Sequence, residues 1–120
     1  MFLFESERDF EVISYSASHG LLLLRSKRTM DQSTRVDILF QDVRAMEMRL
    51  WSKGIKIEQV DPSYVLNQRS VPQAMIEPGN IVYSLSGSDW SGYLLAGIVR
   101  TIEEEEENGK TSGLTQQEQC

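Results

Sequence analysis

Few residues in this chain could support acid–base or nucleophilic chemistry. His19 is the single histidine and Cys120 the single cysteine, so no site that needs two histidines can be built. His19 with a nearby carboxylate could act as a general base, but its neighbours Ser18 and Gly20 favour a solvated turn. A lone thiol forms no internal disulfide, and Cys120 ends the sequence with little around it to lower its pKa. We therefore expect no catalytic residue.

Residues 103–107 are five consecutive glutamates. Carboxylate oxygens bind hard cations, but a calcium loop alternates Asp or Asn ligands, includes a Gly and ends on Glu. Adjacent carboxylates in one run instead repel one another and stay hydrated. We expect no metal site and no cofactor, and we interpret residues 103–120 as an acidic, mobile tail.

The segment from Gly87 to Tyr93 has the composition of a recognition loop, with two aromatic residues among small polar ones. It lacks the Gly-x-Ser-x-Gly spacing of a nucleophile elbow and the lysine of a phosphate loop. Asp89, Trp90 and Tyr93 are therefore candidate binding residues, together with Trp51. The alternative is that Trp90 and Tyr93 anchor the loop to the core, as buried aromatic residues often do.

The net charge of −6 is concentrated towards the end of the sequence. Residues 1–102 hold eleven Arg and Lys against twelve Asp and Glu, whereas residues 103–120 hold one Lys against six Glu. A body so close to neutral is a poor ligand for duplex nucleic acid or an anionic membrane surface. Asp31 and Asp37 offset the four cations gathered around one predicted loop, which are Arg25, Lys27, Arg28 and Arg35. We expect neither a nucleic-acid nor a membrane partner.

The N-terminal residues Met1–Phe4 are apolar, but acidic residues follow at once and no basic segment precedes them. This differs from a secretory signal. No stretch approaches the roughly 18 apolar residues that a membrane helix needs. With one cysteine, nothing in the sequence indicates an oxidising compartment, and we predict a cytoplasmic location.

The elements that position these residues are predicted to be mostly strands. Phe10–Ser16 and Leu21–Lys27 have the composition of a hairpin. Leu21–Leu24 is apolar on both faces, so this strand is expected to be central or covered. A bend at residues 42–44 follows the strand Arg35–Gln41, whose inner face is predicted to hold Val36, Ile38 and Phe40.

Ala45–Val60 has the clearest alternation and predicts one β-hairpin. Its turn is expected at residues 52–54, and Trp51 falls on the hydrated face, where an exposed indole suggests a partner surface or a covering layer. The charged residues of that face would pair across the strands, Glu47 with Lys56 and Arg49 with Glu58. The buried face is expected to hold Met46, Met48, Leu50, Ile55 and Ile57.

The remaining segments are less uniform. Asp61 followed by Pro62 predicts the cap of a helix of one or two turns, and Ile81–Ser86 predicts a strand. Residues 90–107 fit either a helix or a strand. We favour the strand, because Gly97 would weaken a helix by about 1 kcal/mol and the glutamates would crowd its negative end.

Together these patterns predict an all-β or β-rich α+β fold, namely an antiparallel sandwich or open barrel of six to eight strands with at most one short helix. Residues 1–102 are expected to form one domain. The missing motifs favour a non-catalytic protein-interaction or regulatory module that binds another protein, with a homo-oligomer through a sheet face or edge also open. The alternatives are a small bacterial immunity or inhibitor protein acting by occupancy, a carrier of a small ligand inside a barrel, and an enzyme using carboxylates such as Asp37, Asp42, Glu47 or Glu58.

Overall fold

The computed structural model describes residues 2–30, 32–63 and 80–105. They form one antiparallel sheet of eight strands in the order β4-β7-β6-β5-β1-β2-β3-β8, so the predicted all-β fold is confirmed. The strands are β1 (Phe2–Ser16), β2 (Leu21–Ser26), β3 (Thr34–Gln41), β4 (Ala45–Glu47), β5 (Trp51–Val60), β6 (Ile81–Ser86), β7 (Ser91–Ala96) and β8 (Ile98–Glu105).

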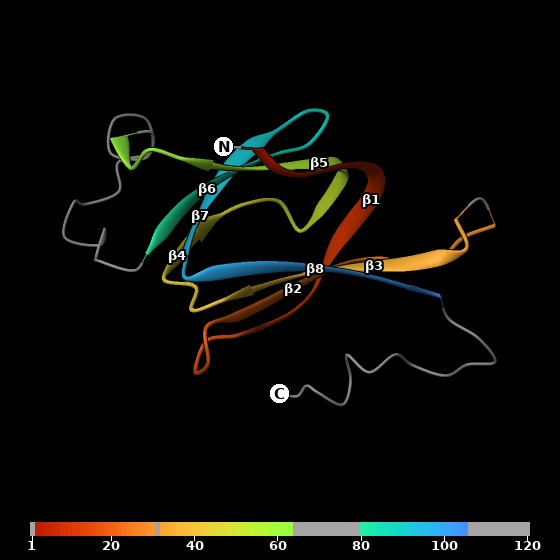
Figure 1. Ribbon diagram of the computed structural model, residues 1–120, viewed down its shortest axis with the longest axis horizontal. Coiled ribbons are helices and arrows are strands. Elements are labelled where there is room, and N and C mark those ends of the chain that lie inside the picture. The colour runs from red at the N-terminus through yellow and green to blue at the C-terminus, as the bar shows by residue number, and fades with distance from the viewer. Residues whose placement is uncertain (1, 31, 64–79, 106–120) are drawn as a thin grey trace.

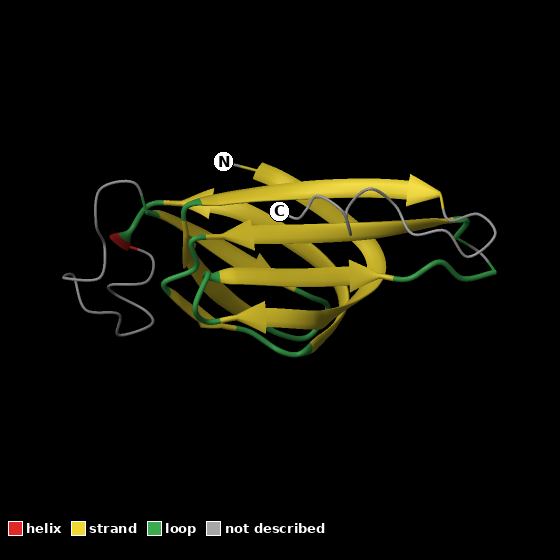
Figure 2. Ribbon diagram, turned by 90° about the horizontal axis from the view of Figure 1, so that it is seen from below, coloured by secondary structure: helices red, strands yellow, loops and turns green. Residues whose placement is uncertain are grey.

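The sheet closes on itself, because its two ends are joined by continuous chain (Figure 1). β3 passes through residues 42–44 into β4, and β7 passes through Gly97 into β8. These two bent segments remain partners along their length, β3 with β8 and β4 with β7. In Figure 2 the strands nearest the viewer cross those of a second layer behind them. The sheet is therefore layered like a sandwich and continuous like a barrel.

The corner between the layers is built from two close backbone contacts. The Gly97 amide donates to the Gln41 carbonyl (2.9 Å) and the Arg44 amide to the Leu95 carbonyl (2.8 Å). Asp42 adopts a left-handed backbone with φ of 59°, a conformation that Asp tolerates better than most residues. A Cβ atom at Gly97 would lie 3.1 Å from the Cβ of Asp42. Gly97 thus lies at the corner between β7 and β8, where the chain passes close to Gln41 and Asp42. Residues 90–107 therefore contain two strands and not one continuous element.

β1 belongs to both layers. Its N-terminal part pairs with β5 and its C-terminal part with β2, and Glu11 lies opposite both Trp51 and Arg25. Register shifts occur between Ser6 and Asp9 against β5, and between Val12 and Ser14 against β2. Such bulges bend a strand and increase its twist, which allows β1 to cross from one layer to the other.

The core lies between the layers and follows the predicted alternation in most strands. The buried side chains include Leu22 and Leu24, the expected inner residues of β3, and Ile55 and Ile57 of β5. Phe40 and Tyr83 meet edge to face with ring centroids 5.8 Å apart. The full cluster is Phe10, Leu22, Leu24, Val36, Ile38, Phe40, Val43, Ile55, Ile57, Tyr83, Leu85, Leu94 and Ala96.

The predicted hairpin over Ala45–Val60 is wrong. β4 pairs with β7, whereas β5 pairs with β1 and β6, so the two segments are not neighbours. Met46 is 37% exposed and Leu50 75% exposed, although both were expected to be buried. The three residues assigned to the turn lie inside β5, where Gly54, with φ of 73°, sits at the bulge against β1.

The other predicted elements agree with the structure where it describes them. The β1–β2 hairpin, β3 and β6 are present, and β1 begins earlier than expected, at Phe2. Asp61 accepts a hydrogen bond from the Ser63 amide (2.9 Å), and hydrogen bonds from Ser63 lower the pKa of its carboxyl. The rest of that predicted helix, residues 64–68, lies outside the described residues. β8 continues through Glu105, so residues 103–105 of the predicted tail belong to the sheet.

Candidate functional site

The four predicted binding residues do not form one cluster. Trp51, at the start of β5, is 52% exposed, as its position on the hydrated face predicted. Asp89 is exposed, Trp90 is half-buried against the main core and Tyr93 is buried. Tyr93 belongs to a second, smaller apolar cluster with Val82 and Leu95. Of these four residues, Trp51 alone lines one of the two large grooves on the described part of the molecule.

Trp90 anchors the β6–β7 turn to the start of β5. Its indole Nε1 donates to Ser52 Oγ (2.9 Å), and Ser52 is itself buried. A Cβ atom at Gly87 would lie 2.3 Å from that indole nitrogen, so only glycine leaves room for the ring. Because Ser52 points inward, strand alternation directs its neighbour Trp51 outward. Trp90 therefore acts as a core anchor that helps to orient Trp51.

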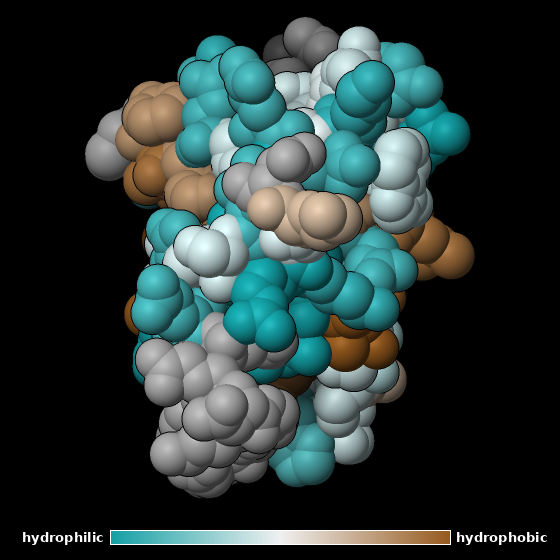
Figure 3. Space-filling view, turned by 90° about the vertical axis from the view of Figure 1, so that its right-hand side faces the viewer, coloured by the Kyte–Doolittle hydropathy of each residue, from teal (hydrophilic) through white to brown (hydrophobic). Residues whose placement is uncertain are grey.

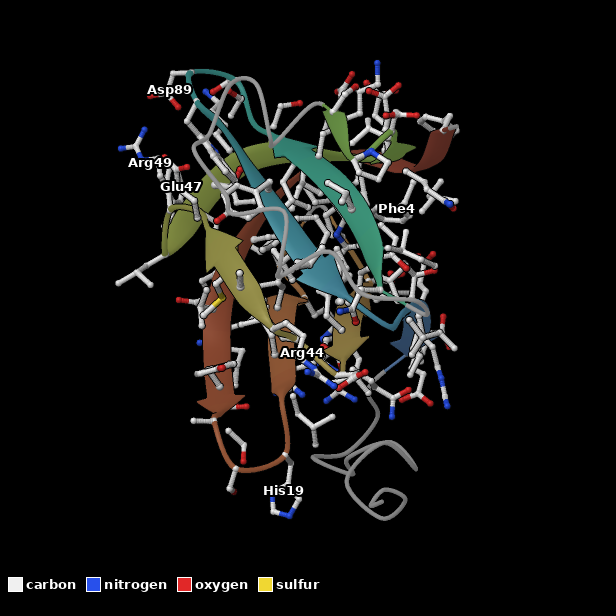
Figure 4. The ribbon with its side chains drawn as sticks, turned by 90° about the vertical axis from the view of Figure 1, so that its left-hand side faces the viewer. Phe4, His19, Arg44, Glu47, Arg49 and Asp89 are labelled. Atoms are coloured by element: carbon white, nitrogen blue, oxygen red, sulfur yellow. The ribbon has the colours of Figure 1, made fainter. Side chains whose placement is uncertain are left out.

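Asp89 forms an ion pair with Arg49 (3.0 Å) at the surface, and Figure 4 shows both side chains together at one corner of the molecule. This pair replaces the predicted pairing of Arg49 with Glu58. Both side chains are more than half exposed, and ion pairs of this kind contribute little to stability. This exposed ion pair adds charge to the surface and does not indicate a catalytic or binding role.

The groove beside Trp51 has a volume of about 370 Å³, within the range of ordinary ligand sites. It lies where β1 bends, next to the end of β2 and the following loop. Figure 3 looks onto this end of the molecule and shows mainly hydrophilic side chains, with the apolar ones in separate patches. We call this site the Trp51 groove; its lining is Glu7, Arg8, Asp9, Phe10, Glu11, Arg25, Ser26, Lys27, Thr29, Gln32 and Trp51.

The cations of the Trp51 groove are already engaged by the protein. Arg25 Nε lies 2.7 Å from Asp37 Oδ1, and Lys27 Nζ lies 3.3 Å from Glu11 Oε2. By contrast, the exposed carboxylates Glu7 and Asp9 form no ion pair with any described residue. The groove therefore presents available negative charge close to an exposed indole.

Arg8 is a groove residue with extensive contacts, and no motif in the sequence indicated its role. Its side chain is largely buried, and it donates to Ser26 Oγ (3.0 Å), Thr34 Oγ1 (3.0 Å) and the Thr34 carbonyl. It also lies 3.8 Å from Glu103 Oε2. Arg8 thereby ties the bulged part of β1 to three other strands and holds one wall of the groove. Residues 5–9 are all polar or charged, so no alternation in the sequence indicated that the strand begins early.

A second groove of about 430 Å³ lies on the other side of Glu7. It runs between β1 and β5 beside the β6–β7 turn, and polar or charged residues make up most of its lining. Lys53 and Lys56 face it from β5, opposite Glu5 and Glu7 of β1. This lining carries both signs of charge and no arrangement that indicates a reaction.

The carboxylates considered for an enzyme are not arranged as a pair. β7 and β6 lie between the strands that carry Glu47 and Glu58, so the predicted proximity of these two residues is wrong. Glu58 lies 3.8 Å from Lys56 instead. Asp42 pairs with Arg44 at the surface. Asp37 forms buried ion pairs with Arg25 and Arg35.

Asp37 is 1% exposed and Arg35 is 4% exposed, although both lie on the outer face of β3. Asp37 binds Arg25 through both carboxylate oxygens and lies 3.5 Å from Arg35 Nε. Arg35 in turn reaches Glu104 of β8 (3.3 Å). Buried charges of this kind require partners, so this chain of ion pairs holds β2, β3 and β8 together. Asp37 was expected to offset the nearby cations, and it does so by direct ion pairs with Arg25 and Arg35.

The remaining sequence candidates contribute no site. His19 lies at the exposed tip of the β1–β2 turn (Figure 4), within 3.1 Å of the hydroxyls of Ser16 and Ser18. Cys120 lies outside the described residues. Within the part of the chain that the structure describes, no three His, Cys, Asp or Glu side chains are grouped to hold a metal ion. No helix among the described residues is long and apolar enough to span a membrane.

Comparison with known proteins adds no relative to this picture. No protein-family model, no curated protein and no solved structure matches the chain.

Proposed function

We propose that this chain is a non-catalytic protein-interaction module that binds a segment of another protein in the Trp51 groove. The observation that carries the proposal is the half-exposed indole of Trp51 in a groove of about 370 Å³. Exposed aromatic residues are enriched where proteins bind one another, because they supply contact area with little loss of conformational freedom. The partner, on this proposal, is another cytoplasmic protein.

The charges of the groove support a polypeptide as the ligand. Glu7 and Asp9 form no ion pair within the described part of the chain, whereas Arg25 and Lys27 already bind carboxylates of this chain. A phosphate backbone would meet negative charge and few available cations. A lysine or arginine of a partner protein could instead lie against the Trp51 ring and reach a carboxylate.

Site-specific photocrosslinking in cells tests the proposal. A photoreactive amino acid replaces Gln32, which lines the groove, and a matched control replaces the exposed His19 at the distant turn. We expect a discrete protein adduct from position 32 that disappears in Trp51→Ser and is absent from position 19. An adduct that persists in Trp51→Ser, or equal labelling from both positions, would contradict the proposal.

The inhibitor alternative belongs to the same class and would use the same groove. It predicts that the crosslinked partner is an enzyme whose activity falls when this chain binds it. Assaying the identified partner with and without the wild-type chain separates this alternative from a module that only recruits its partner.

A further inference from the structure

We propose that two copies of this chain associate through the exposed edge of β1, residues Ile13–Ser16, by antiparallel strand pairing. One edge of this segment pairs with β2. On the other edge, the Val12 amide donates to the Leu50 carbonyl (2.8 Å), and beyond Val12 none of the described residues pairs with it. The segment is therefore an open sheet edge, and open edges are templates for another strand.

Both faces of this segment are also uncovered. Ile13 is 38% exposed and Tyr15 43% exposed, and Ser14 between them is exposed as well. In a strand that packs on a core, only alternate side chains face water. Tyr15 lies opposite the fully buried Leu22 in the β1–β2 ladder, so it points towards the interior side and is nonetheless exposed. The sheet leaves apolar surface uncovered at this point.

The charge of the edge argues that the occupant is a second copy. Residues 12–18 contain no charged side chain, although natural edges are commonly protected by charges. Two copies related by a two-fold axis bring the same surface together, and here no like charges would meet. β8, the strand at one end of the sheet order, carries glutamates at residues 103–105, which would repel their equals in such a pair.

Apolar residues on the opposite side of the opening extend the surface that a second copy would cover. Leu50 emerges beside Val12, and Met46 of β4 lies on the same sheet face as the buried Leu94. Both are exposed in the single chain. None of the residues assigned to this edge lines the Trp51 groove, so pairing through β1 leaves that groove open. The proposal thus goes beyond the proposed function and can fail independently of it.

Sedimentation velocity on the full chain over a range of micromolar concentrations tests the association. We expect wild type to form dimers and Ile13→Lys to weaken the dimer by at least about tenfold, because a lysine from each copy then lies within one short paired segment. Met30→Lys is the matched control, since it introduces the same charge at a fully exposed residue outside the edge. A wild-type chain that stays monomeric, or equal dissociation by both variants, would overturn the proposal.

Two measurements keep the test independent of any misfolding of Ile13→Lys. Mixing that variant with Ile13→Glu is expected to restore a heterodimer. In wild type, the amides of residues 13–16 should exchange with solvent more slowly as the protein concentration rises. Exchange rates that do not depend on protein concentration would refute self-association. If a photoreactive amino acid at position 13 of the monomer crosslinks only to other proteins, the edge instead binds a strand of a different protein.

Discussion

The two tryptophans of this chain have opposite roles: Trp90 is a core anchor and Trp51 is exposed. Both roles depend on Ser52, which binds Trp90 and follows Trp51 in the sequence. Trp90 is held inward by Ser52, and Trp51, the residue before Ser52, is thereby directed outward. The sequence predicted the exposure of Trp51 from alternation over Ala45–Trp51. The structure instead places Trp51 at the start of β5, so the exposure is correct but the strand assignment is not. The sequence left Trp90 open between anchor and binding site, because composition alone does not show which hydroxyl an indole will reach.

This difference predicts unequal effects of removing the two rings. Trp90→Ala should lower the free energy of unfolding by about 3 kcal/mol, because it removes packing and leaves Ser52 without its indole donor. Trp51→Ala should change it by less than about 1 kcal/mol. Urea denaturation followed by far-UV circular dichroism measures both. Equal losses of stability would show that Trp51 is also a structural residue.

Tyr83 predicts a loss of stability at high pH. Burial raises the pKa of its phenol above the ordinary value of 10.0. The stabilisation from keeping this phenol neutral is complete below the pKa of the unfolded chain and is lost as the pH rises through the folded pKa. We expect Tyr83→Phe to reduce the alkaline loss of unfolding free energy, and absorbance at 295 nm should reveal one phenolate that forms late. If the variant and wild type lose stability in parallel, this assignment is wrong.

At the scale of the elements, alternation correctly predicted most strands and most buried faces, with Met46 and Leu50 as exceptions. It did not predict strand partners. Ile55 and Ile57 are buried as expected, yet β5 pairs with β1, whose paired residues lie between 40 and 56 positions earlier. A Gly-containing break between two alternating runs is typical of a turn, but a glycine at a β-bulge produces the same pattern. The choice between these two depends on a distant strand, so the local sequence could not decide it. The Trp51 groove was missed for the same reason, because it is formed where β1 bends.

The ion pairs across β2, β3 and β8 predict a large loss of stability when the buried carboxylate of Asp37 is removed. Asp37→Ala should lower the free energy of unfolding by about 3–5 kcal/mol, because Arg35 stays buried without this carboxylate. Asp42→Ala is the control, since its ion pair with Arg44 is exposed and should contribute less than about 1 kcal/mol. Chemical denaturation of the two variants provides the comparison. A small effect at Asp37 would mean that water reaches Arg35 readily.

At the scale of the whole molecule, the sheet is held closed at β8 by contacts on both of its faces. Glu103 lies near Arg8 on one face, and Glu104 pairs with Arg35 on the other. The acidic run was predicted to be a hydrated tail because like charges repel in an isolated segment. That argument omitted two arginines far away in the sequence. Part of the run therefore serves the fold.

Truncation can measure this contribution. A chain that ends at Ile102 should be less stable than one that ends at Glu105 by about 1–3 kcal/mol, because it loses both glutamate contacts and three residues of ladder. The difference should shrink as salt is added, since partly exposed ion pairs are screened. Thermal unfolding of both chains at low and high ionic strength tests this. Equal stability at low salt would contradict a structural role for the glutamates.

Closure of the sheet also fixes an order of events during synthesis on the ribosome. β1, β2 and β3 emerge first and can pair locally, but the second edge of β3 waits for β8, which begins at Ile98. Until then, a nascent chain exposes the edge next to the apolar Ile38 and Phe40. Long-range pairing of this kind folds slowly and leaves strand edges open to aggregation. β8 thus determines how long this edge of a nascent chain stays open to pairing with other strands.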